Sequence, residues 1–169
     1  MDLAIVIFLL GGLFLGWSLG SNDAANVFGT AVGTRMVRFK TAAIVCSLFI
    51  ILGAVISGSG TTETLGKLGA INALPGAFAA CVAAGLSVYI MTKFGLPVST
   101  TQAIVGAIVG WNLYTGSSTN IKVLLTILST WILCPIIAAL IAMLFFILTK
   151  RLLKNTTWHI LRLDAYTRT

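Results

Sequence analysis

The chain has 169 residues, of which 58% are hydrophobic and 9% are charged. Soluble domains carry about 25% charged residues, so this chain has too few charges to cover a surface exposed to water, and we interpret it as an integral membrane protein. This excludes a disordered regulator and a secreted disulfide scaffold, and the net charge of +7 is better explained as a topology signal than as a nucleic-acid footprint.

Five apolar runs are candidates for membrane helices, each of which needs about 20 apolar residues to cross a bilayer. In chain order they are Leu3–Gly20 (apolar again to Gly33 after a polar interruption), Thr41–Ser57, Ile71–Met91, Leu96–Tyr114 and Val123–Leu148. Pro135 interrupts the last run, and a membrane helix can absorb it as a kink. The first run lacks a basic segment and a cleavage site, so we expect it to be retained. The sequence predicts an all-α polytopic membrane protein.

The basic residues favour one orientation in the cell membrane. Eight fall on one side (Arg35, Arg38, Lys40, Lys150, Arg151, Lys154, Arg162 and Arg168) and two on the other (Lys67 and Lys122). The positive-inside rule then places the N-terminus outside and the C-terminus in the cytoplasm. We expect residues 1–149 to form the membrane domain and residues 150–169 to form a basic, amphipathic cytoplasmic tail.

The third and fourth runs leave two topologies open. Five full crossings satisfy the predicted orientation, and so do three crossings with one re-entrant hairpin made of residues 71–91 and 96–114. Length permits full spans. However, Gly95 and Pro97 form a break that precedes a new helix start, and a hairpin tip would place the hydroxyl groups after Pro97 at membrane depth.

Asp23 is the acidic residue that lies inside an apolar run. A carboxylate at membrane depth is costly and usually marks a functional site. Asn22 and Asn26 are four residues apart and share a helix face. A polar interruption here predicts a broken first helix, whose freed carbonyls, with Asp23 and the amide oxygens, would suit a small cation such as Na⁺. The structural alternative is that Asp23 only caps the broken helix.

A second polar cluster, Ser99, Thr100, Thr101 and Gln102, follows Pro97. Hydroxyls and unpaired amides at a helix N-terminus form an anion site. The alternative is a helix cap with small residues that aid helix packing. A cation site and an anion site in one membrane unit predict cation-coupled anion uptake.

Two motifs resemble those of the inorganic phosphate transporter (PiT) family. The segment Gly20–Val27, G-S-N-D-A-A-N-V, resembles the family signature G-A-N-D-V-A-N-A, and Gly29–Thr34 and Gly95–Ala103 are also similar to that family. The resemblance covers most of residues 11–112. Family members are sodium- or proton-coupled phosphate symporters with two inverted repeats, and the second motif is associated with a re-entrant hairpin. The resemblance therefore implies one inverted-topology repeat with a re-entrant hairpin and three crossings.

The resemblance also implies roles for individual residues. Those implied for phosphate binding are Asp23, Ser99, Thr100, Thr101 and Gln102, and those implied for Na⁺ binding are Asn22, Asp23, Asn26 and Ser99. Ser21 and Ala25 replace the Ala and Val of the family signature. Gln102 stands where many members have His, which would alter proton sensitivity.

Only one copy of each motif is present, so the chain resembles the N-terminal half of a family member. We expect a half-transporter that carries phosphate with Na⁺ by alternating access. It would need a complementary half, from a separate chain, the rest of a precursor or a second copy, and the full transporter would form a homo-oligomer. No cofactor is expected besides the coupling ion. The alternatives are H⁺ coupling, transport of sulfate or another oxyanion, and a non-transporting membrane subunit. An enzyme is not expected, because the apolar runs hold no nucleophile–base pair.

Overall fold

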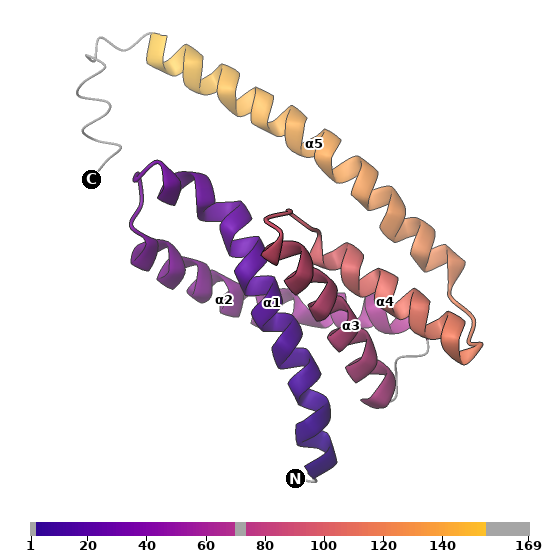
Figure 1. Cartoon of the computed structure of the whole chain (residues 1–169). Helices are drawn as coiled ribbons and strands as arrows, with labels where there is room; N and C mark the ends of the chain where they lie inside the picture. The colour runs from indigo at the N-terminus through magenta and orange to yellow at the C-terminus, as the bar shows by residue number, and fades with distance from the viewer. Residues whose placement is uncertain (1–2, 70–73, 155–169) are drawn as a thin grey trace. The chain divides into compact units, whose positions relative to one another are not determined.

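The computed structural model describes residues 3–69 and 74–154, and every regular element in those ranges is an α-helix. The helices are α1 (Leu3–Gly33), α2 (Phe39–Leu68), α3 (Leu74–Lys93), α4 (Thr100–Thr115) and α5 (Ile121–Lys154) (Figure 1). They belong to two compact units, one that ends at Ile121 and one that begins at Lys122. The predicted all-α class is confirmed. The predicted tail falls mostly on residues 155–169, which lie outside the described residues.

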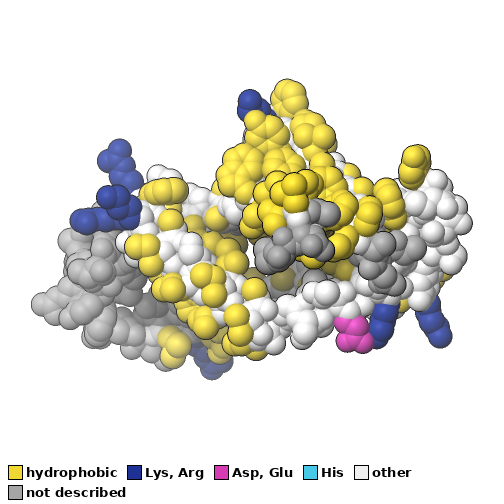
Figure 2. Space-filling model, turned by 90° about the horizontal axis from the view of Figure 1, so that it is seen from below, with side chains coloured by type: hydrophobic (Ala, Val, Ile, Leu, Met, Phe, Trp, Pro, Cys, Tyr) yellow, Lys and Arg dark blue, Asp and Glu magenta, His cyan; other side chains and the backbone are white. Residues whose placement is uncertain are grey.

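Four of these helices, α1, α2, α3 and α5, are long and apolar enough to cross a bilayer. Large apolar side chains are exposed along them: Val55 and Ile56 on α2, for example, are 80% and 76% exposed. Figure 2 shows apolar side chains gathered on the face in view, with Lys and Arg side chains at its margins. Apolar surface of this extent is stable in lipid rather than in water, so the chain is a multi-pass membrane protein.

Helix α1 is continuous from Leu3 to Gly33, so the prediction of a broken first helix is wrong. The polar residues that suggested a break find partners without leaving the helix. Ser21 donates its hydroxyl hydrogen to the Ser18 carbonyl at 2.8 Å, while the side chains of Asn22 and Asp23 bond to other helices. Because the helix is continuous through Asp23, the backbone around Asp23 offers no freed carbonyls for a cation.

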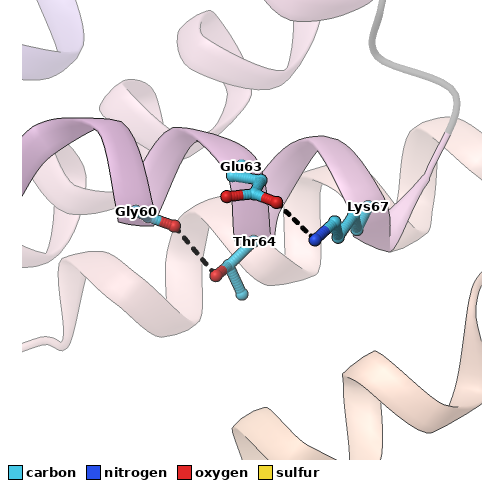
Figure 3. Close-up of polar contacts among 4 residues, drawn as sticks. All are labelled: Gly60, Glu63, Thr64 and Lys67. Atoms are coloured by element: carbon cyan, nitrogen blue, oxygen red, sulfur yellow. Dashed lines mark hydrogen bonds and ion pairs between the residues drawn. The ribbon is translucent and has the colours of Figure 1, made fainter.

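Helix α2 continues to Leu68, beyond the apolar run that ends at Ser57. Hydroxyl groups in the polar extension bond to carbonyls of their own helix, as Thr64 does to Gly60 at 2.9 Å, and Glu63 pairs with Lys67 one turn away (Figure 3). The pair of opposite charges one turn apart stabilises the helix, and the hydroxyl groups find acceptors without leaving it.

Helix α3 lies beside α1 and runs in the same direction (Figure 1). The ring of Phe8 meets that of Phe78 with centroids 5.7 Å apart, and Trp17 meets Tyr89 at the same separation. Both contacts join positions 70 or 72 residues apart, so the two helices stay in register over several turns. Between them Gly85 is buried, and its missing side chain lets the α1 backbone approach closely.

Helices α3 and α4 form an antiparallel hairpin, in which Gly76 lies against Trp111. The turn begins as a Schellman motif, with Gly95 in the left-handed region at a φ of 68°. Its amide donates to the Thr92 carbonyl and the Leu96 amide donates to the Met91 carbonyl, both at 3.0 Å. We call residues 94–99 the hairpin tip.

The tip contacts α1 well before that helix ends. Val98 of the tip, with Thr92 before it and Thr100 after it, contacts α1 at Asn22 and Asp23. Helix α1 then continues to Gly33, which is eleven residues beyond Asn22, or about 16 Å at 1.5 Å per residue. At the other end of the unit, the Asn120 amide, in the loop that follows α4, donates to the carbonyl of Leu68 at the end of α2 at 3.0 Å.

Candidate functional site

The two predicted polar clusters meet where the hairpin tip contacts α1. Thr100, the first residue of α4, donates its hydroxyl hydrogen to Asp23 Oδ2 over 3.1 Å, across 77 positions of sequence. Thr100 is buried and Asp23 is half-buried. The carboxylate of the first cluster therefore lies beside the helix start of the second.

Asn22 joins α1 to both sides of the hairpin tip. Its side chain is 5% exposed. In the orientation that satisfies its amide group, the NH₂ group donates to the Val98 carbonyl oxygen at 2.9 Å and to Asp23 Oδ1 at 3.3 Å. The amide oxygen then accepts from the Thr92 hydroxyl at 3.0 Å. The Asn26 amide, one turn further along α1, lies 3.2 Å from the same amide group. Asn22 thus fixes the tip against α1 and holds one oxygen of Asp23.

The start of α4 leaves backbone amides directed beyond the helix. Ser99 caps it, since its hydroxyl oxygen accepts from the Gln102 amide at 3.3 Å. The first backbone bond of the helix runs from the Ala103 amide to the Ser99 carbonyl at 3.1 Å. Within residues 3–69 and 74–154, the amides of Thr100 and Thr101 have no partner. Two such amides at the positive end of a helix dipole suit an anion.

The side chains of Thr101 and Gln102 are not part of this network. Both are exposed, and neither makes a side-chain hydrogen bond among the described residues. Successive residues of a helix point in different directions, so Thr101 and Gln102 do not face Asp23 as Thr100 does. They are available to a ligand or to another segment of protein.

The Asp23 carboxylate has no basic partner in the part of the chain that the structure describes. The ion pair found there is Glu63 with Lys67, near the end of α2. Nor do the described residues hold a group of three or more His, Cys, Asp or Glu side chains suited to a transition metal. A carboxylate at membrane depth without a compensating charge favours a bound cation, and oxygen ligands favour a hard one.

Two residues near the site were not predicted from the sequence. Thr92 bonds to Asn22, but nothing in the sequence distinguishes it from other threonines in apolar helices. Ser18 is fully buried, and its hydroxyl has no hydrogen-bond partner in the described residues. Its spacing of four from Asn22, and of eight from Asn26, was a signal that could have identified it.

Residues 19–167, which include both clusters, match the phosphate transporter family. The chain belongs to this family. A candidate phosphate permease of Thermococcus kodakarensis is 38% identical over 166 residues, which cover 92% of this chain and 41% of that protein. A candidate phosphate permease of Pyrococcus furiosus is 36% identical, over 91% of this chain and 40% of its own length.

A relative of lower identity is the chloroplastic inorganic phosphate transporter 2-1 of Arabidopsis thaliana, which is 31% identical over 85% of this chain and 26% of its own length. The chain thus spans about two-fifths of the length of the two archaeal relatives and about a quarter of the length of the plant relative. No solved structure matches it. The resemblance to phosphate transporters found in the motifs is confirmed over nearly the whole chain.

Proposed function

We propose that the chain is one half of a secondary transporter that carries inorganic phosphate across the cell membrane together with Na⁺. The observation that carries this proposal is the 3.1 Å hydrogen bond from Thr100 to Asp23. It joins a carboxylate that has no basic partner among the described residues to a helix start with two unpaired amides. One small region thus attracts a cation and an anion.

Phosphate binds at the N-terminus of α4 in this proposal. The amides of Thr100 and Thr101, with the hydroxyls of Ser99 and Thr101, donate to its oxygens, and Gln102 lies within the same turn. An anion at this position faces the Asp23 carboxylate. Two like unit charges roughly 6 Å apart repel by about 3 kcal/mol at an effective dielectric constant of about 20, so phosphate binds weakly while Asp23 is uncompensated.

Na⁺ removes that repulsion, which is the proposed origin of coupling. Asp23, Asn26 and Ser99 have oxygens that can coordinate it. Asn22 is proposed to position Asp23, because its own amide is already engaged by Thr92 and the Val98 carbonyl. Neither ion then binds well alone, and the two are carried together.

The geometry of the helices supports a re-entrant hairpin in this transporter. Helix α4 has 16 residues, or about 24 Å, which is shorter than a bilayer core of about 30 Å. The hairpin tip also stops about 16 Å short of Gly33, after which Arg35 and Arg38 mark a membrane surface. Helices α1, α2 and α5 would then be the three crossings, with the Arg35 side in the cytoplasm.

The rest of the site is proposed to come from a complementary half. The chain spans about two-fifths of the archaeal relatives, and Asn26, Thr101 and Gln102 are exposed at the level of the hairpin tip. Polar side chains at membrane depth usually face protein or a water-filled cavity. A second, inverted repeat would cover them, and movement of one half against the other would give alternating access in a homo-oligomeric transporter.

The test is phosphate uptake by a chimera in which this chain replaces the matched segment of the Thermococcus kodakarensis relative. The Asp23→Asn variant keeps an oxygen that accepts from Thr100 but removes the negative charge. We expect it to lower Na⁺-driven uptake into proteoliposomes at least ten-fold, which corresponds to about 1.4 kcal/mol. Lys67→Ala, which changes an exposed ion pair far along α2, is the matched control and should retain uptake.

Undiminished Na⁺-driven uptake by the Asp23→Asn chimera would show that this site assignment is wrong. Uptake driven equally by a proton gradient without Na⁺ would replace Na⁺ coupling with H⁺ coupling. Competition by sulfate as effective as competition by unlabelled phosphate would replace phosphate with a broader class of oxyanions.

A further inference from the structure

A hollow lies beside the site, on another face of α1. It is a groove of about 600 Å³ between the second half of α1 and the first half of α2. Small residues form much of its wall, among them Gly20, Ala24 and Gly29 on α1 and Ala43, Cys46 and Ser47 on α2. A side chain added at Gly20 or Gly29 would meet nothing within 4 Å. The groove is therefore open space flanked by two helices.

The walls of the groove have the chemistry of a helix-packing surface. In membranes, small residues let helix backbones approach one another closely, and this contact drives helix association in place of the hydrophobic effect. Here the small residues recur at intervals of four or five along α1 and line the facing part of α2 as well. Two such surfaces around one hollow can receive a third helix between them.

The groove also adjoins the proposed ion site. Ser21 and Ala24 line it, and they flank Asn22 and Asp23 in the sequence. A segment that fills the groove would therefore press on the part of α1 that carries the carboxylate.

We propose that this groove is the docking site of a transmembrane helix from the part of the transporter that the relatives carry beyond the length of this chain. The proposal rests on the proposed function, in which this chain is one half of a transporter. The matched segment is 41% of the Thermococcus kodakarensis relative, so more than half of that protein lies outside it and can supply the helix. A second copy of this chain fits less well, because a symmetric contact would place hollow against hollow.

The experiment expresses this chain and the unmatched remainder of the Thermococcus kodakarensis relative as two separate polypeptides. The tagged chain is purified in mild detergent and the recovered remainder is measured. Gly29→Leu fills the groove, whereas Gly16→Leu places the same side chain on α1 outside it, and an added Cβ meets nothing within 4 Å at either position. We expect Gly29→Leu to lower recovery of the remainder at least ten-fold and Gly16→Leu to leave it unchanged.

A second variant distinguishes a filled groove from a folding defect caused by the first. Ala43→Leu fills the same groove from α2 and should lower recovery as Gly29→Leu does, while the helical circular dichroism of all variants matches the wild type. Equal recovery with the Gly29 and Gly16 variants would overturn the proposal, and so would failure of the unaltered chain to recover the remainder.

Two further outcomes name other occupants and would also overturn the proposal. If a differently tagged copy of this chain is recovered and Gly29→Leu abolishes that recovery, the occupant is a second copy. If groove filling changes only the amount of bound phospholipid, the occupant is a lipid chain. If the unaltered chain recovers the remainder but the chimera takes up no phosphate, the proposed function is wrong and the docking site is still supported.

Discussion

Replacement of Thr92 by valine tests how the hairpin tip is held against α1. Valine has nearly the same shape as threonine, so Thr92→Val removes the hydroxyl group with little change in packing. That hydroxyl bonds to the amide of Asn22 at 3.0 Å, across 70 positions of sequence. The variant leaves the Asn22 amide without this partner at a position that is only 5% exposed.

The expected cost follows from the burial of Asn22. An unsatisfied buried polar group costs about 1–3 kcal/mol, and hydrogen bonds between membrane helices average about 0.6 kcal/mol with a maximum of about 1.7 kcal/mol. We therefore expect Thr92→Val to lower the free energy of unfolding by about 1–2 kcal/mol. Thr64→Val is the matched control, because the Thr64 hydroxyl is exposed and bonds only to the Gly60 carbonyl of its own helix (Figure 3). Its effect should stay within about 0.5 kcal/mol.

The assay is reversible unfolding in mixed micelles with increasing denaturing detergent. Tryptophan fluorescence follows the unfolding, and Trp17, which lies against Tyr89, contributes the part of the signal that reports the contact of α1 with α3. A double-mutant cycle with Asn22→Ala should give a coupling energy of about 0.5 kcal/mol or more. Equal losses for Thr92→Val and Thr64→Val, or a coupling energy of zero, would show that the hydrogen bond does not hold the hairpin tip.

Two further substitutions test the turn and the helix contact. Gly95→Ala should lower the free energy of unfolding by about 1–2 kcal/mol, because Gly95 is left-handed at a φ of 68°, and an unchanged midpoint in the same detergent titration would contradict the Schellman turn. Gly11→Ala should cost about 1–3 kcal/mol, since a Cβ there would lie 2.7 Å from the Phe78 ring. Gly12→Ala, whose Cβ meets nothing within 4 Å, should not destabilise, and similar results for the two glycine variants would show that α3 does not pack on this face of α1.

The class and the helices of this protein could be predicted from its sequence because a bilayer leaves few choices. A chain in lipid must satisfy its backbone internally, so a long apolar run forms a helix. Helix ends were harder to predict. The run that ends at Ser57 continues as helix to Leu68, since hydroxyl groups and a Glu–Lys pair can satisfy a polar segment within its own helix.

The residue types of the candidate site could be predicted from the sequence, but the contacts between them could not. Asp23 and Thr100 stood out because a carboxylate and a cluster of hydroxyls are rare in apolar segments. The prediction of a broken helix at Asp23 failed for a physical reason. Polar groups interrupt a helix when they must bond to its backbone, and here the hairpin of α3 and α4 supplies other partners.

The sequence by itself determined that the chain resides in a membrane, that its spans are helices and that two polar clusters interrupt its apolar surface. These properties depend on the local preference of side chains for lipid or water and on backbone groups that find partners nearby. The tertiary structure alone decided that α1 stays whole and that Asp23 meets Thr100. That contact depends on the parallel register of α1 and α3, which the combined packing of aromatic and small side chains along both helices sets.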